Sequence, residues 1–221
     1  MDFRDSVCSS PLDLSLGSED CVRDRLIHSR FFDVAGPHGA GSSVTSWTGG
    51  LQAVKLSGEL PPGWCGNLTA GLLHRKVSIV RGFARRIVDR RWIAELQVQS
   101  PEGGSGLSDT DCLALAWAAP EPQPPVEIAL DSYYVDGSPE AGPFLFLEVN
   151  GYDRIGFLAS LLERLARQSL LPEQISLETW EGLALDCFHL KTAAGGPPPP
   201  ETARALSQML ESLRVPAIGR C

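Results

Sequence analysis

The sequence has no long hydrophobic run and comparatively few positive charges. No window approaches the roughly 20 consecutive apolar residues that a membrane-spanning helix requires, and the apolar run Leu113–Ala119 is far shorter. Lys and Arg together number 19 against 27 Asp and Glu, which gives a formal net charge of −8. An acidic protein lacks the general electrostatic attraction that draws proteins to nucleic acids or anionic membranes. We therefore expect neither as a partner.

The usual patterns for metal binding and nucleophilic catalysis are also missing. The 6 cysteines form no C-x-x-C pair, and the 4 histidines stand apart from one another. Zinc sites need closely spaced ligands, and no G-x-S-x-G motif is present. We therefore expect no metal, no cofactor and no enzymatic activity. Because the N-terminal residues carry early acids and no apolar segment typical of a signal peptide, we expect a cytoplasmic protein with reduced thiols.

The clearest structural pattern lies in the second half of the chain. A strand-like run, Phe144–Val149, leads through a polar turn to Gly156, where a helix with leucines at helical spacing begins. Two more strand-like runs, Ile175–Thr179 and Leu183–Leu190, precede a second helical pattern from Ala203 to Leu213. This order of elements is most of a split βαβ unit of the ferredoxin type.

The first half repeats the pattern more faintly, after roughly 90 residues. Its strand candidates are Leu51–Leu56, Val77–Phe83 and Trp92–Val98, and its helix candidates are Trp64–His74 and a helix capped by Ser108 that ends at Trp117. The proline-rich run Pro120–Pro125 is typical of a semi-rigid linker.

These patterns predict three parts of the chain. Residues 1–43 form an N-terminal segment with a short helix beginning after Ser18, residues 44–125 form one unit, and residues 126–221 form another. The run Val126–Val135 either closes the first unit as its last strand or leads into the second. After Leu213 the second unit retains only a short segment for a fourth strand, and Pro216 would restrict that strand to a sheet edge.

Two motifs resemble a known family. Asp153-Arg154-x-Gly156-x-Leu158-x-x-Leu161 resembles the D-R-P-G-L-L signature of ACT domains, which are small-ligand regulatory modules, with Ile155 where the family usually has proline. The second motif, Thr179-x-x-Gly182-x-x-x-Asp186-x-Phe188-x-Leu190, resembles the later strands of the same domain. The resemblance implies an α+β protein of two tandem ferredoxin-like (βαββαβ) ACT domains. This tandem arrangement is similar to the ACT pair of the bacterial nitrogen-sensing uridylyltransferase and to the glycine cleavage repressor.

The candidate binding sites are the two turns that join the first strand of each unit to its first helix. A helix N-terminus offers unpaired N–H groups to a carboxylate, a glycine admits the ligand to the backbone, and a nearby acid or amide could bind an ammonium group. The resemblance implies that an amino acid binds at such turns. The alternative is that Asp153 only caps the helix and Gly156 only packs. The candidate residues are Asn150, Asp153, Arg154, Ile155, Gly156, Phe157 and Leu158 in the second unit, and Glu59, Pro62, Gly63, Trp64 and Asn67 in the first.

Three further features have alternative interpretations. Cys65 would lie in a first helical turn, where the helix dipole lowers a thiol pKa, although a packed small hydrophobe is the commoner case. The basic run from Arg75 to Arg91 could bind an acidic partner or nucleic acid, or could be the solvated edge of a sheet. The candidates for one buried sheet face are Phe144, Phe146, Ile175 and Leu177.

The sequence therefore predicts a non-catalytic, homodimeric regulatory protein that binds a small molecule, an amino acid above all, and relays its presence to a partner protein. Two alternatives remain open. One is a constitutive interaction module whose ligand site has decayed, which Ile155 and the turn before Trp64 both favour. The other is a repressor-like regulator of transcription, supported only by the basic run.

Overall fold

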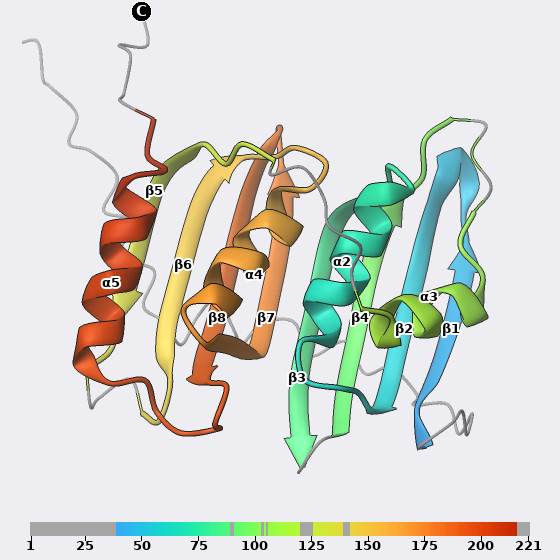
Figure 1. The fold of residues 1–221 in the computed structure, drawn as a ribbon. Helices are drawn as coiled ribbons and strands as arrows, with labels where there is room; N and C mark the ends of the chain where they lie inside the picture. The colour runs from blue at the N-terminus through green and yellow to red at the C-terminus, as the bar shows by residue number, and fades with distance from the viewer. Residues whose placement is uncertain are drawn as a thin grey trace, which may run out of the picture.

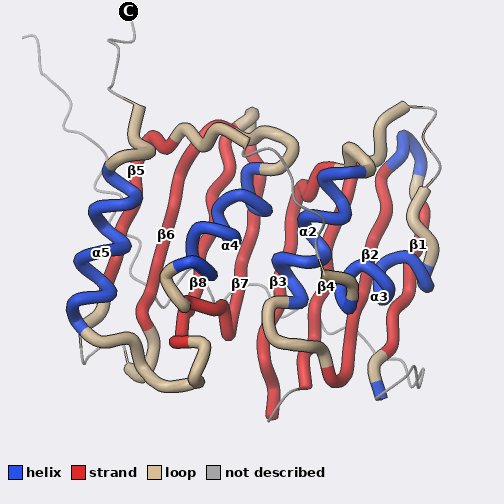
Figure 2. The backbone as a smooth tube through the Cα atoms, in the orientation of Figure 1, coloured by secondary structure: helices blue, strands red, loops and turns tan. Residues whose placement is uncertain are grey.

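The backbone forms one antiparallel sheet with helices on a single face. The computed structural model describes residues 39–88, 91–102, 104, 106–119, 126–138 and 142–215. Its eight strands have the spatial order β1-β2-β4-β3-β7-β8-β6-β5. In Figure 1 every described helix lies in front of the sheet, and Figure 2 shows the strands as one layer behind them. The predicted α+β class is confirmed.

Most elements lie where the sequence predicts them, but β1 was not predicted and β7 begins at Leu170, ahead of the predicted run Ile175–Thr179. The bounds are as follows. The strands are β1 Gly41–Ser46, β2 Leu51–Glu59, β3 Ser78–Val88, β4 Arg91–Gln99, β5 Leu130–Asp136, β6 Leu145–Tyr152, β7 Leu170–Trp180 and β8 Leu183–Thr192. The helices are α2 Trp64–His74, α3 Asp109–Trp117, α4 Phe157–Arg167 and α5 Pro200–Glu211, with a short 3-10 turn, η2, at Thr48–Gly50. None of the described helices has the length and apolar character to cross a membrane.

The order of the elements differs from the predicted βαββαβ. Each half runs strand, strand, helix, strand, strand, helix, so the strand expected last comes first. In the second half this strand is β5, which pairs with β6. The run Val126–Val135 therefore leads into the second half and does not close the first. Because the whole sheet is antiparallel, the place beside β6 can be filled by a strand from either end of the half. Among the described residues that follow α5, Arg214 forms an isolated bridge with Leu130.

The two halves are joined by antiparallel pairing of β3 with β7. The pairs run from Arg81 opposite Glu178 to Arg85 opposite Gln174, with Phe83 opposite Ser176 at their centre. This pairing corrects the prediction that the basic run forms a sheet edge, since β3 lies inside the sheet. Two of its arginines instead form ion pairs with glutamates of β7, Arg81 with Glu178 at 3.1 Å and Arg86 with Glu173 at 3.0 Å.

One hydrophobic core extends through both halves on the face that carries the helices. It includes Ile175 and Leu177 of β7 as predicted. Phe146 was predicted to share that face, but its neighbours Leu145 and Leu147 belong to this core and side chains alternate along a strand. Phe146 therefore lies on the opposite face, where its ring is 5.4 Å from that of His189. Phe144 was also predicted for the core face, and its ring instead packs against His189 at 5.6 Å.

Several other predictions fall at or outside the limits of the described residues. The boundary predicted between residues 43 and 44 falls within β1. The short helix predicted after Ser18 and the linker Pro120–Pro125 both lie outside the described residues.

Ser108 caps α3 as expected, through a capping box with Asp111.

A single substitution tests the core that β7 shares with both halves. Leu177 is 4% exposed, so we expect Leu177→Ala to lower the free energy of unfolding by about 2–4 kcal/mol, the cost of removing a buried leucine side chain. The measurement is urea unfolding followed by circular dichroism. The matched control is Leu185→Ala on the neighbouring strand, where the leucine is 40% exposed. Equal losses in the two variants would contradict the assignment of Leu177 to the core.

Candidate functional site

The two predicted turns have the same backbone design. Each ends in a glycine at the helix N-cap with positive φ, Gly63 at 77° and Gly156 at 92°. No side chain caps either helix. This corrects the interpretation of Asp153 as the cap of α4. The first N–H of each helix bonds instead to a backbone carbonyl of its turn, Trp64 to Pro61 and Phe157 to Arg154.

The β3–β7 pairing places each turn beside the helix of the other half. Because the two strands are antiparallel, α2 and α4 lie next to each other and cross the middle of the sheet (Figure 1). The turn before α4 shares a cavity with Leu72 and Leu73 of α2. The turn before α2 shares another with Leu162 and Ala166 of α4.

The cavity at the second turn is small. Its volume is about 40 Å³, which is room for about one water molecule. A Cβ built on Gly156 would lie 2.9 Å from both Leu73 Cδ1 and Val126 Cγ2. Gly156 is therefore a residue that permits close packing between the halves, which was the alternative interpretation of it.

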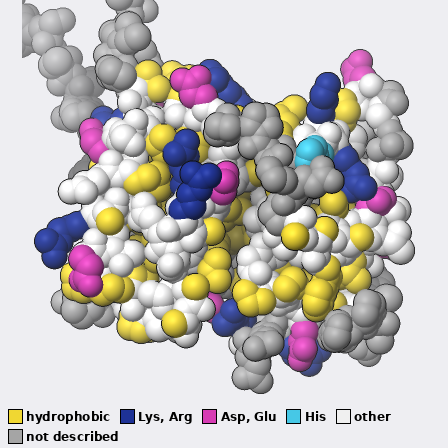
Figure 3. All heavy atoms as spheres, viewed as in Figure 1, with side chains coloured by type: hydrophobic (Ala, Val, Ile, Leu, Met, Phe, Trp, Pro, Cys, Tyr) yellow, Lys and Arg dark blue, Asp and Glu magenta, His cyan; other side chains and the backbone are white. Residues whose placement is uncertain are grey.

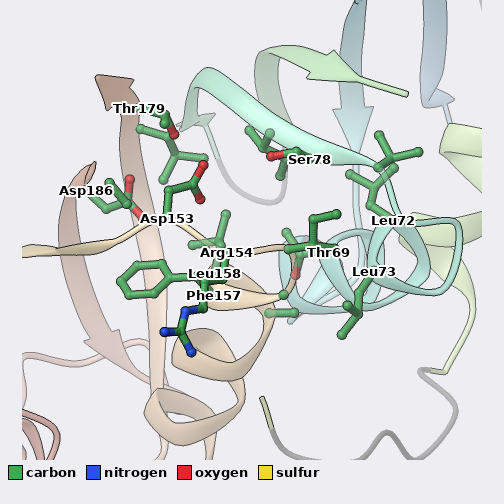
Figure 4. A pocket seen from close by; sticks show the side chains of 17 residues that line it. Thr69, Leu72, Leu73, Ser78, Asp153, Arg154, Phe157, Leu158, Thr179 and Asp186 are labelled. Atoms are coloured by element: carbon green, nitrogen blue, oxygen red, sulfur yellow. The ribbon is translucent and has the colours of Figure 1, made fainter. Parts of the chain in front are cut away.

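Two carboxyl groups and a hydroxyl meet at this small cavity (Figure 4). Burial, followed by the nearby charge of Asp153, raises the pKa of Asp186 to about 8 from an ordinary value of 3.8. Burial also raises the pKa of Asp153, while a hydrogen bond from Thr179 opposes the change. At neutral pH the Asp186 side chain is accordingly held in its neutral, protonated form.

The cavity at the first turn, which we call the α2–α4 cavity, is much larger. Its volume is about 470 Å³, within the range of roughly 300–1,000 Å³ typical of small-molecule sites. A Cβ built on Gly63 would meet no atom within 4 Å, so this glycine borders open space. In the space-filling view, hydrophobic side chains gather between the two halves on the face that carries the helices (Figure 3).

Polar groups without protein partners lie in the wall of the α2–α4 cavity. Trp64 is 2% exposed, and its Nε1 is buried without a hydrogen-bond partner, as is Nε of Arg86. Burying a donor without a partner costs free energy. The Trp64 ring packs edge-on against Trp92 at 5.4 Å, and the Arg86 guanidinium lies 5.6 Å from the Trp92 ring centre.

The structure brings most of the predicted residues to one cavity or the other. Asp153, Arg154, Ile155, Gly156, Phe157 and Leu158 line the small cavity, and Pro62, Gly63, Trp64 and Asn67 line the α2–α4 cavity. Two predicted residues line neither. Asn150 lies in β6 between Val149, which belongs to the core, and Gly151, so it points away from the helices. Glu59 is exposed at the end of β2.

Cys65 lines the α2–α4 cavity, but its thiol is not activated. Burial, reinforced by the charge of Asp186, raises the pKa of the Cys65 thiol to about 12. Of the two interpretations of Cys65, the packed small hydrophobe agrees with the structure, because desolvation of the thiolate outweighs the effect of the helix dipole. Among the described residues, no cluster of His, Cys, Asp and Glu side chains has the arrangement to hold a metal ion.

Sequence reasoning missed the residues that other elements contribute to the cavities. Arg86 had been grouped with the basic run, and Trp92 had been assigned only to a strand, yet both line the α2–α4 cavity. Thr179 and Asp186 line the small cavity and belong to the second motif of the ACT resemblance, so that motif could have indicated them as site residues. Residues of α4 such as Leu162 and Glu163 could not be found, because their position depends on how the halves pack.

Comparison with known proteins gives one structural likeness. No protein-family model matches the sequence, and no curated protein is significantly similar to it. Among solved structures, the chain is similar to the crystal structure of aspartate kinase from Synechocystis, with a TM-score of 0.42 and 15% sequence identity. The aligned region covers 74% of this chain but only 27% of the aspartate kinase chain. A likeness of this size does not establish a shared function.

The buried acid predicts an unusual dependence of stability on pH. Because the pKa of Asp186 is higher in the folded protein than in the unfolded chain, the stability it contributes is full below about pH 4 and is lost as pH rises toward 8. We expect Asp186→Asn to remove this component, which has an upper limit of about 1.4 kcal/mol per pH unit.

The measurement is the free energy of unfolding from pH 4 to 9 for the wild type and the variant. Carboxylates other than the neighbouring Asp153 contribute equally to both proteins, so the difference between the two curves isolates Asp186 together with its interaction with Asp153. Asp131→Asn, at an exposed position of β5, serves as the control. Parallel curves for wild type and Asp186→Asn would contradict a neutral Asp186.

Proposed function

We propose that this protein is a regulatory module of the ACT type, which binds a small organic molecule in the α2–α4 cavity and acts without catalysis. The observation that carries the proposal is the cavity itself. It is large enough for a ligand and borders the open turn at Gly63. The motif resemblance supplies the ligand class, of which amino acids are the leading members.

The position of the cavity between the halves suggests how ligand binding would be relayed. Its wall combines α2 and β3 of the first half with α4 and β7 of the second. A ligand that contacts both helices stabilises one packing of α2 against α4 over others, and only such a difference in affinity can shift a conformational equilibrium. We propose that a partner protein, or a second copy of this chain in a homodimer, reads that change.

The absence of catalysis is part of this proposal and has one chemical support. Cys65 is the thiol in the cavity wall, and a nucleophilic cysteine needs a thiolate at working pH. A thiol pKa of about 12 keeps Cys65 protonated.

A constitutive interaction module is the second candidate. It is favoured by large apolar side chains exposed near the β7–β8 hairpin, with Trp180 65% exposed and Tyr152 45% exposed. Exposed apolar groups that lie together often mark a contact surface. In this case the module would bind its partner whether or not the cavity is filled.

Thermal-shift measurements of the purified protein with the twenty amino acids and the purine nucleotides test the proposal. A ligand at about a hundred times its dissociation constant adds roughly 2.7 kcal/mol to the free energy of unfolding, which raises the midpoint by a few degrees. We expect at least one amino acid to produce such a shift.

Two variants locate the site that produces the shift. Ala70→Leu places extra volume in the α2–α4 cavity and should abolish the shift, whereas Asp153→Ala at the small cavity should leave it. The reverse result would move the ligand to the second turn. A folded protein whose midpoint does not respond to any compound would contradict ligand sensing and favour the constitutive interaction module.

A further inference from the structure

We propose that the α2–α4 cavity selects its ligand by a flat apolar body of about two fused rings, and that the charged groups of an amino acid ligand add little to the affinity. This inference rests on the proposed function in placing the ligand in this cavity, and it adds the chemical class. Four observations support it: the apolar surface that a ligand can reach, the small residues on both helices, the volume between them, and the ion pairs that already occupy the charged side chains.

The part of the wall that a ligand can reach is apolar. Only side chains that keep solvent-accessible surface can contact a molecule that enters from outside. The apolar lining residues that keep such surface come from both helices and from β7, and they include Ala70, Leu73, Ala159, Ala166, Leu171 and Pro172. A ligand therefore meets hydrocarbon from both halves of the protein. Each methylene group that it buries there raises the affinity about fourfold.

Small residues line the cavity from both helices. On α2 they include Gly66 and Ala70, and on α4 they are Ala159 and Ala166. A Cβ built on Gly66 would meet no atom within 4 Å, so lack of space does not explain a glycine at a helical position where alanine is more favourable. The two helices lie side by side in Figure 1, and their small residues leave open space between them. A flat body fits between two such walls.

The volume of the cavity indicates the size of that body. An apolar cavity of about 150 Å³ takes up one benzene ring, and the α2–α4 cavity has a volume of about 470 Å³. It therefore has room for about two fused rings and a short linking group. A methyl side chain would leave most of the apolar wall in contact with water. A rigid ring system also loses less conformational freedom on binding than a flexible chain of the same size. Among the amino acids, tryptophan carries such a body.

The charged side chains of the wall already have partners. Two of the lining residues are charged, Arg86 and Glu163. Nη1 of Arg86 lies 3.0 Å from Oε1 of Glu173, and Oε1 of Glu163 lies 2.6 Å from Nη2 of Arg167. The side chains of Arg86 and Glu163 are also 34% and 55% exposed, so solvent screens their charges. A ligand carboxylate or ammonium group would compete with these ion pairs in water and gain little.

Three compounds separate the ring body from the charged groups. L-Tryptophan carries both, 3-methylindole is its side chain without the charged groups, and L-alanine has the charged groups with only a methyl side chain. In calorimetric titrations of the full chain, we expect L-tryptophan to bind no more than about fivefold tighter than 3-methylindole. L-Alanine should bind at least about a hundredfold more weakly than either, because it lacks most of the buried apolar surface.

Three leucine variants assign the binding to the cavity. Gly66→Leu adds a side chain where a Cβ meets no neighbour, so we expect a thermal midpoint no lower than that of the wild type. Because the new side chain occupies the cavity, 3-methylindole should bind at least about tenfold more weakly. Ala166→Leu fills the same space from α4 and should have the same effect. The control is Ala114→Leu at an exposed position of α3, which does not line the cavity and should leave binding unchanged.

The possible results have distinct meanings. If L-tryptophan binds more than about fivefold tighter than 3-methylindole, or if L-alanine binds as tightly as L-tryptophan, the inference is overturned and the proposed function stands. Equal binding of 3-methylindole to the wild type and to both cavity variants overturns the assignment to this cavity. If neither ring compound binds while another amino acid raises the thermal midpoint of the wild type, the inference alone fails. If no compound binds and none raises the midpoint, the proposed function fails with it.

Discussion

The pairing of β3 with β7 is the contact on which the rest of the arrangement depends. Five residue pairs join the halves into one sheet, and two arginine–glutamate ion pairs accompany them. Because the pairing is antiparallel about Phe83 and Ser176, it brings α2 and α4 together and sets each strand–helix turn against the other half. The walls of both cavities combine residues of the two halves, which this junction brings together. Neither half could form them alone.

The same junction leaves different amounts of space beside the two turns, although their backbone conformations are alike. At Gly156 the space beside the turn is occupied by Leu73 and Val126, whereas at Gly63 it is open. The second turn has the motif that resembles ligand-binding family members more closely, yet it contains the smaller cavity. The motif therefore favours the second turn as a ligand site, whereas the available space favours the first. The space beside each turn depends on side chains contributed by the opposite half.

Local features could be predicted from the sequence and features of assembly could not. The leucine spacing of α4, the Ser108 cap of α3 and the glycine turns act within a few residues of chain, and the structure agrees with them. The roles of Arg86 and Trp92 depend on pairing between distant strands. The position of Phe146 was mistaken because alternation along β6 leaves open which side chains face the helices, and the helices decide that. The pKa of Cys65 depends on burial, which outweighs the local dipole.

The bridge at the end of α5 has a consequence for the architecture of the second half. The amide of Leu130 donates to the carbonyl of Leu213, and the amide of Val215 donates to the carbonyl of Leu130. The chain thus enters and leaves this half at the same point of its edge. These two hydrogen bonds anchor the end of α5 to the start of β5, so the last helix is fixed at the edge strand of the sheet.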